Sequence, residues 1–104
     1  MNKRLEMLEK MIAQGSKDPF VRYARALELR SLGELERALA ALDEVRGLHP
    51  DYVPTFLMAG QIAAQLGQLE RARALYAQGI EVARAARDEH ARSELQAALD
   101  GLAG

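Results

Sequence analysis

The stretch Leu32-Gly33-Glu34-Leu35-Glu36-Arg37-Ala38 returns as Leu66-Gly67-Gln68-Leu69-Glu70-Arg71-Ala72, displaced by 34 positions and with one change, Glu to Gln. A repeating unit of that length holds two helices and a turn, and neither helix can bury its apolar side alone. Successive copies therefore have to pack side by side around a shared core. The internal repeat predicts an all-α stack of helical hairpins.

Apolar residues recur at helical spacing on both sides of the two glycines, and no strand-like alternation interrupts them. Asp18, ahead of Pro19, and Asp88 are expected to cap helix N-termini, and Asp51, after Pro50, is expected to cap a third. About six helices are predicted within one domain, residues 1–104: a first helix over 2–14, a first repeat over 19–48, a second over 52–86 and a last helix over 89–102.

The two copies resemble the tetratricopeptide repeat, whose pattern is W-x2-L-G-x2-Y, then A-x3-F, then P. The second copy matches well, with Phe56 at the Trp position, Gly60 at the Gly and Tyr76 at the Phe. The first copy is looser, because Arg22 and Arg25 stand at apolar positions of the pattern. The resemblance implies a right-handed α-solenoid in which the first helix is a half repeat and the last helix is a solvating cap.

The charges exclude several classes of partner. The 14 basic and 15 acidic residues alternate along the chain and sum to −1, so we expect neither nucleic acid nor an anionic membrane as a partner.

The first ten residues carry five charges and no apolar core, and no apolar run approaches the ~20 residues that span a bilayer. Together with the absence of cysteine, these features predict a soluble cytoplasmic protein. Richness in Ala, Leu and Arg indicates a bacterial source.

Residue types that carry chemistry are scarce. Of the two histidines, His49 lies in a predicted turn, and His90 is four residues before Glu94 on the last helix. A metal site would need at least one ligand more than that pair supplies. No phosphate-binding loop and no H-E-x-x-H motif is present. We therefore expect no enzyme activity, no cofactor and no metal.

Tetratricopeptide stacks line a concave groove with side chains from the first helix of each repeat, and the resemblance implies such a groove here. The corresponding residues are Phe20, Tyr23, Leu27, Arg30, Tyr52, Leu57, Gln61 and Ala64. The predicted function is that of an adaptor that binds a peptide or helix of another protein, with Arg30 or Gln61 making an orienting polar contact.

Two alternatives remain open from the sequence. Phe20, Tyr23 and Leu27 share one helical face and would equally pack on Leu8 and Ile12 of the first helix, since apolar stripes at this spacing are usually core. So short a stack also leaves end faces through which the chain would self-associate, for example as a homodimer.

Overall fold

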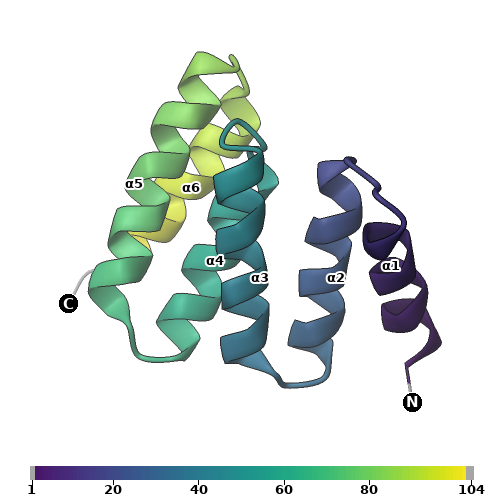
Figure 1. Cartoon of the computed structure of the whole chain (residues 1–104). Helices are drawn as coiled ribbons and strands as arrows, with labels where there is room; N and C mark the ends of the chain where they lie inside the picture. Colours follow the sequence, from purple (N-terminus) through teal and green to yellow (C-terminus); the bar gives the residue numbers. More distant parts are fainter. Residues whose placement is uncertain (1, 103–104) are drawn as a thin grey trace.

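The computed structural model describes residues 2–102, and within that range it consists of six α-helices and no strand (Figure 1). Short turns join the helices, which lie side by side in chain order, so the predicted all-α stack of hairpins is confirmed. The bounds are α1 Lys3–Ala13, α2 Pro19–Ser31, α3 Leu35–Leu48, α4 Pro54–Gln65, α5 Leu69–Ala85 and α6 Glu89–Gly101.

The two copies of the repeated stretch fold alike. Gly33 and Gly67 both have φ +78°, in the left-handed region that glycine enters at low cost. Three residues after each helix the chain turns back in the same way: the Glu34 amide donates to the Leu29 carbonyl at 3.0 Å, and the Gln68 amide donates to the Ala63 carbonyl at 2.8 Å. This identity of backbone geometry is what a true structural repeat requires.

The turn before α6 has the same hydrogen bonds with a different residue at its centre. The Asp88 amide donates to the Ala83 carbonyl at 2.9 Å, as in the two earlier hairpin turns. Arg87, however, occupies the position of the glycine and has φ +58°. A non-glycine residue in that region carries a cost of about 1–2 kcal/mol. The third turn therefore keeps the form of the repeat without its favoured residue.

Close approach between α4 and α5 depends on two glycines. A Cβ atom at Gly60 would lie 2.6 Å from Cδ1 and 2.7 Å from Cζ of Tyr76. A Cβ atom at Gly79 would lie 2.5 Å from Cβ of Phe56. Phe56 and Tyr76 are both buried. In the second hairpin their side chains pack directly against the backbone of Gly79 and Gly60, respectively. The core continues from this hairpin to Leu29 of α2 and Leu95 of α6.

Two of the three expected helix caps are present. The Phe20 amide donates to Asp18 Oδ1 at 2.9 Å, and the Ala91 amide donates to Asp88 Oδ1 at 3.0 Å. The expected cap at Asp51 is wrong, because α4 begins later, at Pro54, and has no side-chain cap. Pro54 lacks an N–H group and fits the first helical position, which moves the start of the helix beyond the Pro50 turn.

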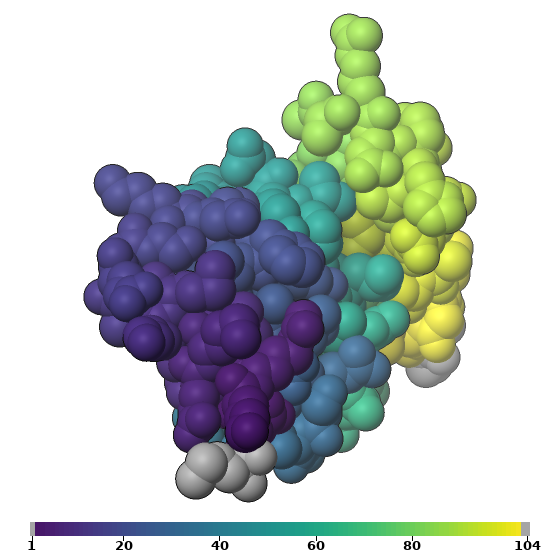
Figure 2. Space-filling view, turned by 90° about the vertical axis from the view of Figure 1, so that its right-hand side faces the viewer, coloured from purple at the N-terminus to yellow at the C-terminus, as the bar shows by residue number. Residues whose placement is uncertain are grey.

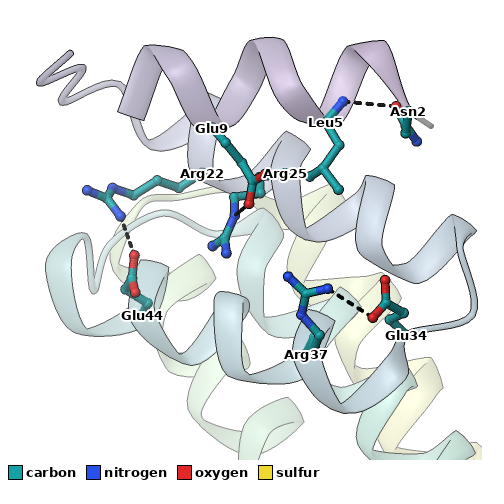
Figure 3. Close-up of polar contacts among 8 residues, drawn as sticks. All are labelled: Asn2, Leu5, Glu9, Arg22, Arg25, Glu34, Arg37 and Glu44. Atoms are coloured by element: carbon teal, nitrogen blue, oxygen red, sulfur yellow. Dashed lines mark hydrogen bonds and ion pairs between the residues drawn. The ribbon is translucent and has the colours of Figure 1, made fainter. Parts of the chain in front are cut away.

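The first hairpin uses ion pairs where the second uses apolar contacts (Figure 3). Arg22, which stands at the position of buried Phe56, pairs with Glu44 of α3. Arg25 pairs with Glu9 of α1, with Nε 3.2 Å from Oε2. Their stems reach partners at the surface, so the two arginines are accommodated without a buried unpaired charge.

Candidate functional site

The first helices of the successive hairpins, α2, α4 and α6, begin 35 residues apart, at Pro19, Pro54 and Glu89. In Figure 2 the teal surface of α4 lies between the purple-to-blue surface of α1 and α2 and the yellow surface of α6. A cavity of about 310 Å³ opens between these helices. Its apolar lining comprises Tyr23 of α2, Val53, Pro54, Leu57 and Met58 at α4, and Ala91 and Leu95 of α6.

Tyr23 is the aromatic wall of this cavity. Its ring packs edge-on against Tyr52, with ring centroids 5.7 Å apart and an interplanar angle of 66°, an arrangement that aromatic pairs favour. Burial raises the pKa of Tyr23, the neighbouring Tyr52 raises it further, and the positive charge of Arg30 lowers it. Tyr23 is therefore a neutral side chain whose ring lines the cavity and packs against Tyr52.

Polar groups stand at the edges of the cavity. Asp88, His90 and Glu94 line it from α6, and His90 Nε2 lies 3.4 Å from Glu94 Oε1. On the side of α2, Arg30 Nη1 lies 3.1 Å from the Met58 sulfur. Residues 2–102 contain no group of three or more His, Cys, Asp or Glu side chains placed to hold a metal ion. The arrangement is suited to enclosing an apolar side chain beside the carboxylates at α6.

The eight predicted groove residues fall into three groups. Tyr23 and Leu57 line the cavity, and Tyr52 and Arg30 contact residues that line it. Phe20 lies outside the cavity and is 54% exposed. The other three are half-buried and lie outside it: Leu27, Gln61 and Ala64.

The alternative in which this stripe packs on the first helix does not describe the contacts of Tyr23. Leu8 of α1 forms a small cluster with Val21 and Ala24, and Ile12 packs against that cluster. Tyr23 instead packs against the larger core. Helix α2 thus turns one face toward α1 and leaves Tyr23 on the cavity.

The residues that the sequence reasoning missed come chiefly from α6. Ala91 and Leu95 belong to the last helix, which was predicted only as a solvating cap, and Asp88 was predicted only to cap its N-terminus. The 35-residue spacing of helix starts was the signal that would have found them, because it makes α6 the first helix of a third, incomplete hairpin. The cavity therefore has three walls where the sequence led us to expect two.

A stack of helical hairpins with a groove along its first helices defines the class of helical repeat proteins. Residues 29–99 match the model of the tetratricopeptide repeat family. This chain belongs to the tetratricopeptide repeat family.

Solved structures agree with this assignment. A tetratricopeptide repeat domain protein from Salinibacter ruber, solved by NMR, is 41% identical over 82% of this chain and 86% of that one, with a TM-score of 0.79. A protein from Bordetella parapertussis is 25% identical, covers 98% of this chain and 89% of its own, and gives a TM-score of 0.83. The crystal structure of PcrH in complex with the chaperone binding region of PopD shares the fold at 18% identity, with 94% of this chain and 74% of PcrH covered and a TM-score of 0.86.

No curated protein gives a significant match to the chain. None of the helices within residues 2–102 has the length and apolar character needed to cross a lipid bilayer.

Proposed function

We propose that this protein is a non-catalytic adaptor that binds a peptide or helix of another protein in the groove between α2, α4 and α6. The observation that carries the proposal is the cavity beside Tyr23 and Leu57, which is open, mainly apolar and bordered by charged groups. Sites of this size and lining hold apolar groups, with a few polar contacts that fix orientation. Membership of a family of interaction modules supports a protein partner.

Another protein with this fold forms a complex with a region of a second protein. PcrH, which shares the fold, was crystallised with a region of PopD. Relatives of similar length come from Salinibacter ruber and Bordetella parapertussis, which supports a bacterial source for this chain. The cytoplasmic location remains a prediction from the sequence.

The test is chemical crosslinking in the source cells followed by mass spectrometry. We expect one recurring partner to be recovered with the native chain and lost with Leu57→Ala. The matched control is Leu69→Ala, which truncates a 46% exposed leucine that does not line the cavity. Thermal unfolding of both variants establishes that they are folded. Retention of the partner by Leu57→Ala and Leu69→Ala alike would contradict the groove.

Self-association is the second candidate function, and one observation favours it. Met7 and Met11 lie one turn apart on α1, at the end of the stack, and are 62% and 39% exposed. Methionine pairs of this kind adapt readily to a partner surface. Light scattering over a range of concentrations decides between the two functions. A homodimer that dissociates on Met7→Glu would support this candidate, whereas a monomer at every concentration would remove it.

A further inference from the structure

The charged residues in the cavity lining include two carboxylates. Asp88 and Glu94 stand on the α6 side, whereas Arg30 of α2 lies outside the lining and contacts only Met58 of it. An apolar side chain that enters the cavity would therefore leave some of its neighbours in the partner chain beside these carboxylates.

The carboxylates of the α6 edge are not neutralised by the protein itself. Within residues 2–102 neither Asp88 nor Glu94 has an ion pair with Lys or Arg, and the only ionisable partner of Glu94 is His90. Glu89, on the other hand, is paired with Arg92, with 2.8 Å between Oε2 and Nη2. Two carboxylates that line the cavity are thus available to a cationic group of a partner.

We propose that the groove selects a segment in which a Leu, Met or Phe enters the cavity and a nearby Lys or Arg meets Asp88 and Glu94. This inference rests on the proposed groove function and adds the chemistry of the partner to it. Carboxylates on one side of the cavity fix the direction of the bound segment, and they reject a segment that brings a carboxylate to α6. An acidic partner segment is the case that the geometry disfavours.

The first experiment selects binders without assuming a sequence. A random peptide library displayed on phage is selected on the full chain, and in parallel on Leu57→Ala as a control for the cavity. We expect the sequences enriched on the native chain alone to combine one large apolar residue with Lys or Arg a few positions away. Enrichment of Asp or Glu at those positions, or of no charge at all, would overturn the inference.

The second experiment measures the contribution of each carboxylate to the affinity of the best selected peptide, by fluorescence anisotropy. Glu94→Gln and Asp88→Asn are each expected to raise the Kd by about two- to five-fold, the range of a partly exposed ion pair. Asn is as good a helix cap as Asp, so Asp88→Asn removes the charge and keeps the start of α6. The control is Asp100→Asn, which removes one charge from the same helix outside the cavity and should leave the Kd unchanged.

The two proposals fail differently. If Leu57→Ala abolishes binding but Glu94→Gln and Asp88→Asn behave like Asp100→Asn, the groove stands and the basic partner is refuted. If the native chain enriches no peptide that Leu57→Ala does not also enrich, the groove and the basic partner both fall. A salt-dependent Kd that loses its salt dependence in the two edge variants supports the inference.

Discussion

Replacing a helical glycine by alanine should lower the stability of this protein at one position and raise it at another. Gly60 of α4 faces the ring of Tyr76, and a Cβ atom there would lie well inside van der Waals contact with three ring carbons. Gly47 of α3 is exposed, and a Cβ atom there would meet nothing within 4 Å. The same Gly→Ala change therefore tests packing at one site and helix propensity at the other.

The magnitudes follow from two terms. In an open helical site, Gly→Ala stabilises by about 0.5–1 kcal/mol, which is the expectation for Gly47→Ala. At Gly60 that gain is opposed by overpacking, which costs about 1–3 kcal/mol. The upper part of that range applies, because Tyr76 is only 3% exposed and has no open space to move into. Gly60→Ala should therefore lower the free energy of unfolding by about 1–2 kcal/mol.

Thermal unfolding followed by far-ultraviolet circular dichroism measures both variants. For a chain of this size the expected Tm changes are roughly −5 to −10 °C for Gly60→Ala and roughly +2 to +5 °C for Gly47→Ala. Replacing Tyr76 by Leu should make Gly60→Ala less costly, with a coupling free energy of about 1 kcal/mol in a double-mutant cycle. A Gly60→Ala protein as stable as Gly47→Ala would refute the packing described for α4 and α5.

Three further outcomes are expected. Thr55→Val should raise the urea midpoint and increase the free energy of unfolding by about 1 kcal/mol, because the buried Thr55 hydroxyl has no hydrogen-bond partner within residues 2–102. A lower midpoint would mean that the hydroxyl is hydrogen-bonded. Arg87→Gly should raise the free energy of unfolding by about 0.5–1 kcal/mol, because glycine adopts a positive φ without strain. A loss of stability in urea unfolding would contradict the strain inferred for this turn. Burial raises the pKa values of Tyr23, Tyr52 and Tyr76 above the unfolded value of about 10, so the stability due to their neutral form is complete below pH 10 and lost as the pH rises through the folded values. Denaturant unfolding at a series of alkaline pH values should show that decline, and stability that rises above pH 10 would be inconsistent with it.

The fold was predictable because its main signals are local. The repeated stretch around Gly33 and Gly67 specifies a turn that depends on one glycine, and Asp18 and Asp88 specify helix starts through bonds to amides two or three residues away. The start of α4 was predicted wrongly because two local signals compete there. Asp51 is a good cap by residue type, but Pro54 determines where helical geometry begins.

The cavity was less predictable, because it depends on how three helices meet. Tyr23 and Leu57 followed from the repeat pattern, but the contribution of α6 depends on its docking against the second hairpin. The pattern also ranked Phe20 with Tyr23, since both are aromatic residues of one helix. Only the tertiary arrangement separates an exposed ring from one that forms a wall.

The small apolar cluster at the N-terminal end has a consequence for how the molecule opens. Leu8 clusters there with Val21 and Ala24, Ile12 packs against them, and Leu5 reaches the main core. The other ties of α1 to α2 include partly exposed ion pairs such as Arg4–Glu28 at 2.8 Å. In linear arrays each element is stabilised chiefly by its immediate neighbours, so an end unit with few buried contacts can detach while the rest stays intact. Amide hydrogens of α1 should consequently exchange with deuterium earliest among the helices, and at a rate that increases with salt concentration. Helix α1 would then unfold as a separate, weaker cooperative unit, while helices α2 to α6 remain folded.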